Sequence, residues 1–248
     1  MTAAQLTVNG KRPPVLGTFS KAIDGARALS FGQSGGKHCP TSCRYHPEST
    51  AAGAIGGCYA VRTEAYRSAT LRPKLVRHES ADPDDLIAAA MDDLDKRHAF
   101  RLPWFRFSPF GQVPQQPPRL FRKLCQRLAA AGTPIHLPIA GPWIVKRYRR
   151  ALAGLNVAVR ESVHSARRWR IAPGAVSIVA GEGLPMLERI PAAKRAARVR
   201  TAATGRRCIV CPAVADSPRF GGRGAGLAKC GRCTACADPD TDIVYPHH

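Results

Sequence analysis

Between residues 104 and 210 the chain alternates short aliphatic runs with longer amphipathic segments, and this alternation restricts the possible folds more than any other feature. The aliphatic runs predict strands and the amphipathic segments predict helices. With one earlier run included, the expected strands are 28–33, 104–108, 135–139, 155–160, 175–180 and 207–210. The expected helices are 82–98, 118–131, 142–153, a short stretch from Ser162, and 185–203. Strands that alternate with helices pair in parallel through right-handed crossovers.

Six such units predict an α/β fold, a partial and open parallel barrel of about six strands, because a closed eightfold barrel usually needs about 250 residues by itself. The chain has 248 residues, of which 44% are hydrophobic, so it can bury a core and is not a disordered basic protein. We expect three segments along the chain. They are an irregular basic arm at 1–27, the barrel at 28–206, and a small cysteine-rich module that binds a metal or cluster at 207–248.

Residues 82–98 form the clearest helical pattern. Asp82 can cap the helix, and Pro83 suits its first turn. Apolar side chains recur on one face of this segment. They are Leu86, Ile87, Ala90, Met91 and Leu94.

The charge is strongly unbalanced, with a formal net charge of +21. Residues 96–237 contain 27 Lys and Arg but only four acids, whereas seven acids lie between Glu79 and Asp95. A basic surface of this kind favours a polyanionic partner, such as a nucleic acid, although a solvated outer face is the alternative. The chain has few aromatic residues for base stacking, so sequence-specific reading of a nucleic acid is not expected.

No apolar run reaches the roughly 18 residues that a membrane helix needs, so no membrane partner is expected. The first ten residues lack the charged-then-apolar order of a secretory signal, and we therefore expect a cytoplasmic protein. In a reducing compartment, the nine cysteines indicate metal or cluster ligation rather than disulfides. Cys125 lies apart from the others on an apolar helix face and is expected to pack in the core.

The first cysteine group is Cys39, Cys43 and Cys58, in a Gly-rich loop after the first expected strand. Three thiolates suit a 4Fe–4S cluster that leaves one iron open to a ligand. A zinc site would need a fourth donor, for which His38 and His46 are near in sequence. Spacing alone leaves zinc and iron–sulfur open.

The second group contains Cys208, Cys211, Cys230, Cys233 and Cys236. Two Cys-x2-Cys pairs separated by eighteen residues match a zinc ribbon. The added Cys236 makes a Cys-x2-Cys-x2-Cys run, which is a spacing of cluster ligands. Zinc and a second 4Fe–4S cluster both remain open for this group.

Four segments, FGQSGGKHCPTSC, GGCYAVR, FRFSPFGQVP and the cysteine-rich end with DIVYPHH, resemble the radical S-adenosylmethionine (SAM) superfamily. The closer resemblance is to the gene-product-88-like proteins of phages and plasmids. The resemblance implies that Cys39, Cys43 and Cys58 hold a 4Fe–4S cluster whose open iron binds SAM. The cysteine spacing departs from the usual pattern, because fourteen residues separate Cys43 from Cys58, and Gln112 stands where a carboxylate is usual.

The same resemblance implies the residues that would contact SAM. Tyr59 would lie beside the adenine, and Gly111 and Gln112 would contact the methionyl amine. The remaining implied contacts are Arg160 and Ser162 at the ribose and carboxylate, and Gly181 and Glu182 under the adenine.

The expected function is therefore that of a radical-SAM-like enzyme. It would cleave SAM reductively, with an electron donor as partner, to start radical chemistry on a substrate that could derive from nucleic acid. The alternative is a non-catalytic zinc-ribbon protein of a phage or plasmid that binds nucleic acid.

Overall fold

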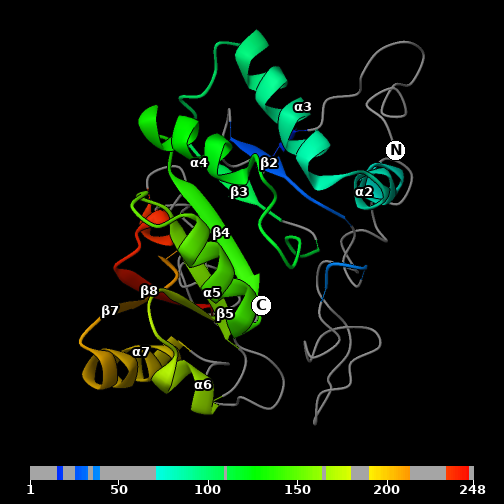
Figure 1. Cartoon of the computed structure of the whole chain (residues 1–248). Coiled ribbons are helices and arrows are strands. Elements are labelled where there is room, and N and C mark those ends of the chain that lie inside the picture. The colour runs from blue at the N-terminus through cyan, green and yellow to red at the C-terminus, as the bar shows by residue number, and fades with distance from the viewer. Residues whose placement is uncertain are drawn as a thin grey trace.

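Figure 1 shows the computed structural model of the chain, which describes residues 16–18, 26–32, 36–39, 71–108, 111–163, 166–179, 190–212 and 233–245. The helices are α2 (Leu71–Ser80), α3 (Pro83–Lys96), α4 (Phe121–Ala130), α5 (Pro142–Ala151), α6 (Ala166–Ile171), α7 (Ile190–Thr204) and the short 3-10 helix η4 (Ala235–Ala237). The strands are β1 (Gly17–Thr18), β2 (Arg27–Leu29), β3 (Phe105–Phe107), β4 (Ile135–Ala140), β5 (Ala158–Val163), β6 (Val176–Val179), β7 (Arg207–Val210) and β8 (Thr241–Tyr245).

All eight described strands belong to one sheet, in the order β1-β2-β3-β4-β5-β6-β8-β7. Strand β1 pairs antiparallel with β2, and every other neighbouring pair is parallel. From β2 to β6 each strand lies beside the one before it, so these connections all step in the same direction, as in the wall of a barrel. Among the described strands, β1 and β7 form the two edges. The prediction of an open, parallel α/β sheet is confirmed.

The last described strand, β8, lies inside the sheet between β6 and β7. It pairs Ser177 with Ile243 on one side and Cys208 with Asp242 on the other. Residues 207–210 and 241–245 are therefore strands of the same sheet as β2 to β6. A separate cysteine-rich module at 207–248 is not confirmed.

The larger core lies between the first half of the sheet and helices α3, α4 and α5, which Figure 1 shows on one side of it. The rings of Phe107 and Phe121 lie 4.5 Å apart between centroids, and Tyr148 meets Phe121 edge-on at 5.0 Å. Cys125 is completely buried among these residues, which confirms its packing role. Burial raises the pKa of its thiol, so it stays protonated.

A smaller core lies where α6 and α7 cover β6 and β8. It contains a fully buried ion pair between Arg200 of α7 and Asp242 of β8, with 2.9 Å between Nε and Oδ2. Arg200 also donates to the carbonyl oxygens of Trp169 and Ala172. This one side chain therefore joins α7, the end of α6 and β8.

The prediction for α3 is confirmed in detail, since Asp82 accepts a hydrogen bond from the backbone N–H of Asp84 at 2.7 Å. The prediction around Ser162 is wrong, because β5 continues to Val163 and α6 begins only at Ala166. Ser162 is held in the sheet by pairing between Ala140 and Ser177. No described helix is both long and apolar enough to span a membrane.

Alternation along the strands gives the sheet two different faces. One face is covered by the helices and carries side chains such as Phe107, Leu137 and Ile178. We call the opposite face the inner face. By the strand register it carries Arg106, His136, Arg160, Ser177 and Ile243.

Candidate functional site

The described residues of the first predicted site lie at or just beyond the carboxyl ends of parallel strands. Cys39 follows β2, Gly111 and Gln112 follow β3, and Ser162 is the second-last residue of β5. This edge is where parallel α/β sheets bind ligands. The other members of the predicted sites, namely Cys43, Cys58, Tyr59, Gly181, Glu182 and Cys230, lie outside the described residues.

Cys39 closes a tight turn at residues 36–39. Its backbone N–H donates to the carbonyl oxygen of Gly36 at 2.9 Å, and its side chain is half-buried. The carboxylate of Glu79 accepts a hydrogen bond from the backbone N–H of Lys37. This carboxylate approaches Gly36 so closely that a Cβ at that position would overlap it. The turn that presents Cys39 is therefore held by a side chain from α2, which lies where a Cβ at position 36 would be.

Helix α2 is an anchor for this loop that the sequence analysis did not predict. His78, at its last turn, lies with Nδ1 2.8 Å from the carbonyl oxygen of Ser30, just after β2. Burial lowers the pKa of His78 to about 4, so the ring is neutral at pH 7 and Nδ1 carries the proton that it donates. His78 and Glu79 thus fix the two ends of the chain segment between β2 and Cys39. The signal available in the sequence was the Leu71, Leu75 and His78 spacing, which Pro73 obscured.

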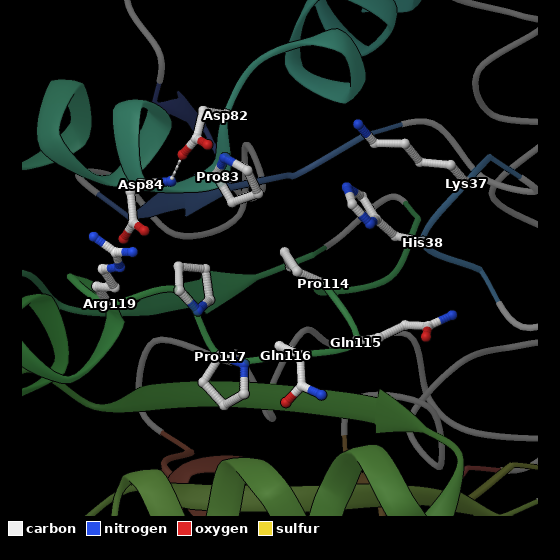
Figure 2. A pocket seen from close by; sticks show the side chains of 11 residues that line it. Lys37, His38, Asp82, Pro83, Asp84, Pro114, Gln115, Gln116, Pro117 and Arg119 are labelled. Carbon is white, nitrogen blue, oxygen red and sulfur yellow. Dashed lines mark hydrogen bonds between the residues drawn. The ribbon is translucent and has the colours of Figure 1, made fainter.

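Beside this turn lies an open cavity of about 470 Å3 (Figure 2). Its walls come from the turn before Cys39, the start of α3 and the Pro-rich segment between β3 and α4. They contribute Lys37, His38, Asp82, Pro83, Asp84, Pro114, Gln115, Gln116, Pro117, Pro118 and Arg119. The carboxylates of Asp82 and Asp84 already accept hydrogen bonds from the backbone. Asp84 accepts the N–H of Leu120 at 2.7 Å, and Asp82 caps α3. Burial and the neighbouring Lys37 lower the pKa of His38, which leaves a neutral imidazole next to Cys39.

Gln112 is buried and bridges two strand ends. Its Nε2 donates to the carbonyl oxygen of Ala140 at 2.8 Å, and its Oε1 accepts the backbone N–H of Val113 at 3.2 Å. The side-chain amide therefore joins the segment after β3 to the end of β4. Both amide atoms of Gln112 therefore have partners within the protein. The contact to the methionyl amine that the resemblance implies stays a prediction.

Arg160 is fully buried on the inner face, and its guanidinium binds the protein backbone. It donates to the carbonyl oxygens of Cys236 at 2.6 Å, Ala235 at 2.8 Å and Val176 at 3.2 Å, and also to Asp238. These bonds use four of the five N–H groups of the side chain. Arg160 therefore fixes residues 235–238 against the sheet. The contact to SAM that the resemblance implies stays a prediction.

The two residues after Arg160 point to opposite faces. Glu161 lies on the helix-covered side and forms a two-point ion pair with Arg168, at 2.6 and 2.8 Å. Ser162 lies half-buried on the inner side, in register with Ala140 and Ser177. Arg160 and Ser162 are the two β5 residues predicted to contact SAM. Ser162 lies nearer the carboxyl end of the strand, and no described hydrogen bond ties its side chain to the backbone.

Cys208 and Cys211 also point to opposite faces of the sheet. Cys208 packs at the edge of the core under α7, and burial raises the pKa of its thiol to about 12. Cys211 follows β7 by one residue and borders a cavity with Ile243, which lies on the inner face. A zinc knuckle needs both sulfurs of a Cys-x2-Cys pair to face one ion. The described arrangement of these two residues does not do this.

The cavity that Cys211 borders lies on the inner face and has a volume of about 120 Å3. Cys233, Cys236 and Tyr245 border it as well, with 2.9 Å between the sulfur of Cys236 and the Tyr245 hydroxyl oxygen. Burial and the nearby thiols raise the pKa of Tyr245, so the hydroxyl stays protonated. The remaining wall is formed by Trp104, Arg106, His136, Pro212, Ala235 and Ile243.

Burial, with Arg106 and Arg160 nearby, holds the pKa of His136 well below its usual value of 6.5. The ring is therefore neutral at pH 7, the form in which imidazole binds metals. Sequence analysis missed His136, because a single His inside an apolar strand gives no spacing signal. Within the described ranges, no three His, Cys, Asp or Glu side chains already converge on the position of a single metal ion.

Comparison with known proteins does not add a relative to this description. No protein-family model, no curated protein and no solved structure matches the chain.

Proposed function

We propose that this chain is an iron–sulfur protein of the radical-SAM type, with a cluster bound by Cys39, Cys43 and Cys58. The observation that carries the proposal is the position of Cys39, in a turn that Glu79 of α2 holds, beyond the carboxyl end of β2 in an open parallel sheet. Loops at this edge converge on one site in parallel α/β folds. The three thiolates would occupy three irons and leave the fourth open.

Cys39 is the described member of the proposed cluster ligands, and Gly111, Gln112, Arg160 and Ser162 are the described members of the proposed SAM contacts. The turn with Cys39 opens beside a cavity of about 470 Å3, which has room for a ligand of nucleoside size. Ser162 stands at the same edge of the sheet. Gln112 and Arg160 bind backbone carbonyl groups instead. SAM would therefore depend more on loop backbone and on Ser162 than the resemblance implied.

When bound, the cluster would pass one electron from an external one-electron reductant to the SAM sulfonium, breaking the C5′–S bond to give methionine and a 5′-deoxyadenosyl radical. The chain's own part is to hold and shield the reacting groups. His78 and Glu79 fix the loop that carries Cys39. Lys37 and Arg119, which line the cavity, provide positive charge for a carboxylate ligand.

Anaerobic purification followed by iron, sulfide and zinc analysis tests this function. We expect a brown protein whose iron content falls in Cys39→Ser, while the matched Cys125→Ala variant, altered only in the helix core, keeps its iron. Reduction in the presence of SAM should release 5′-deoxyadenosine. A colourless protein that contains only zinc would instead support the non-catalytic zinc-ribbon alternative.

We further propose a polyanionic partner or substrate, such as a nucleic acid. The support is an exposed set of basic side chains on the outer helices α5 and α7, which lie on the outside of the sheet (Figure 1). They are Lys146, Arg147, Arg150, Lys194, Arg195 and Arg198. Contacts of this type depend on phosphate charge and weaken steeply as salt rises. The nine cysteines further favour the reducing cytoplasm as its location.

Fluorescence anisotropy with a labelled single-stranded oligonucleotide, measured at several salt concentrations, tests the partner. The triple variant Lys194→Glu, Arg195→Glu, Arg198→Glu should bind more weakly and show a shallower salt dependence. Lys96→Glu on α3 is the control, because Lys96 pairs with Asp92 on an acidic helix. Equal binding by both variants and the wild type would rule out α7 as the contact surface.

A further inference from the structure

The cavity on the inner face is bordered by several side chains of the types that bind metals. Three thiols border it, and they come from two distant parts of the chain. Cys211 follows β7, whereas Cys233 lies just before η4 and Cys236 lies within it. Thiol groups from separate elements that border one internal space are a donor set for a soft metal.

His136 supplies a fourth donor to the same cavity. Its side chain comes from β4, is 6% exposed, and has a buried Nε2 without a hydrogen-bond partner. The indole N–H of Trp104, which also borders the cavity and is 3% exposed, is likewise unpartnered. Buried polar atoms of this kind are rare in native structures, and a bound ion or ligand is one of the partners that satisfies them.

The size of the cavity bears on which metal group it could hold. A tetrahedral zinc site, with Zn–S bonds of about 2.3 Å, brings its sulfurs within ~4 Å of one another. The described donors instead border a space of about 120 Å3 and do not converge on one ion. A space of this size exceeds what one water needs and can hold a cluster of several atoms. A cluster places its iron and sulfide atoms between the protein ligands.

We propose that this cavity holds a second 4Fe–4S cluster, bound by Cys211, Cys233, Cys236 and the imidazole of His136. Cys208 is not a ligand, because its side chain lies on the opposite face of the sheet. The Trp104 indole N–H lies in the same wall and donates to a cluster sulfide. The proposal goes beyond the proposed function, because none of its ligands belongs to the loop of Cys39.

The test begins from the triple variant Cys39→Ser, Cys43→Ser, Cys58→Ser, which removes the first site whatever it binds. After anaerobic purification, this protein should retain about four iron and four sulfide atoms per chain, the content of one cubane. Cys208→Ser added to it should keep the iron, while Cys211→Ser, Cys233→Ser or Cys236→Ser should lose most of it. Zinc without iron in the triple variant, or iron loss in Cys208→Ser, would overturn the proposal.

The role of His136 has its own readout. In the same background, His136→Gln should lose iron and His136→Cys should keep it, because a thiolate replaces the imidazole. Pulsed electron paramagnetic resonance of the reduced triple variant, with His136 intact, should detect coupling of the cluster to a ring nitrogen. This measurement does not depend on whether a variant at position 136 folds. Absence of that coupling, or iron loss in Cys230→Ser while His136→Gln keeps its iron, would remove His136 from the ligand set.

Discussion

The guanidinium Nε of Arg160 donates a hydrogen bond of 2.6 Å to the carbonyl oxygen of Cys236, which lies 76 positions later in the chain. A strand in the middle of the sheet thereby holds the segment that carries the last cysteines. The Arg160 side chain is fully buried, and the same guanidinium serves three further carbonyl groups. Arg160 therefore contributes to holding Cys236 and its neighbours on the inner face, together with the Tyr245 hydroxyl.

Arg160→Met should destabilise the protein by roughly 3 kcal/mol or more, because several buried acceptors lose a charged donor. Release of residues 235–238 should also speed maleimide labelling of Cys233 and Cys236. Denaturant unfolding and mass spectrometry measure the two effects. Arg198→Met, an exposed change on α7, is the control and should alter neither. Unchanged labelling in Arg160→Met would show that other contacts hold the segment.

Stability should decrease as the pH falls from about 6.5 towards 4, in part because of His78. Its pKa is about 4 in the folded protein and 6.5 when exposed, so in this range the unfolded chain binds the proton and the folded chain does not. The gap corresponds to roughly 3 kcal/mol, fully present above pH 6.5 and lost towards pH 4. His78→Gln should flatten this slope in denaturant titrations at several pH values. Identical slopes in the two proteins would contradict the assignment, since the contribution of His136 is common to both.

Gln112→Glu places a carboxylate where the resemblance implies one. The structure predicts that this variant is less stable than the wild type. The substituted side chain cannot donate to the Ala140 carbonyl and instead sets two oxygens against each other. We expect a decrease of about 1–3 kcal/mol in the free energy of unfolding at pH 7. We also expect no gain in 5′-deoxyadenosine formation. A stable variant with increased SAM cleavage would show that Gln112 contacts the cofactor.

Gly36→Ala tests the turn that presents Cys39. The added Cβ would overlap the Glu79 carboxylate and displace it from the backbone N–H of Lys37, at a cost of about 1 kcal/mol for the lost hydrogen bond. Iron content after anaerobic purification should fall with this change. The double variant Gly36→Ala, Glu79→Ala has no Glu79 carboxylate, so it lacks both the overlap and the hydrogen bond to Lys37. Its stability therefore separates the effect of the overlap from the effect of losing that bond. If Gly36→Ala binds full iron, the turn tolerates a side chain at this position.

The sheet and most of its helices could be predicted because their signals are local. Asp82 and Pro83 mark the start of α3, and the alternation of strands and helices sets the parallel order up to β6. The strand β8 escaped prediction because its five residues contain only the Ile243–Val244 pair and Tyr245 as apolar signals. Its place between β6 and β7 depends on pairings that no spacing encodes.

The candidate sites were only partly predictable for the same reason. The sequence indicated that 207–210 is a strand and also that Cys208 and Cys211 form a metal knuckle. Positions three apart on a strand point to opposite faces, so the strand prediction already argued against the knuckle. His136 and the use of Arg160 could not be predicted, because each depends on contacts between elements that are distant in sequence.

The insertion of β8 between β6 and β7 has a consequence for how the protein is made on the ribosome. When β7 has been synthesised, its described partner β8 does not yet exist, and β6 exposes the edge that residues 241–245 cover in the folded protein. Parallel pairing of strands far apart in the chain is slow and leaves nascent edges open to aggregation. The sheet can therefore close only after the cysteines at 230–236 have emerged, and any metal that binds them is acquired at the last stage of folding.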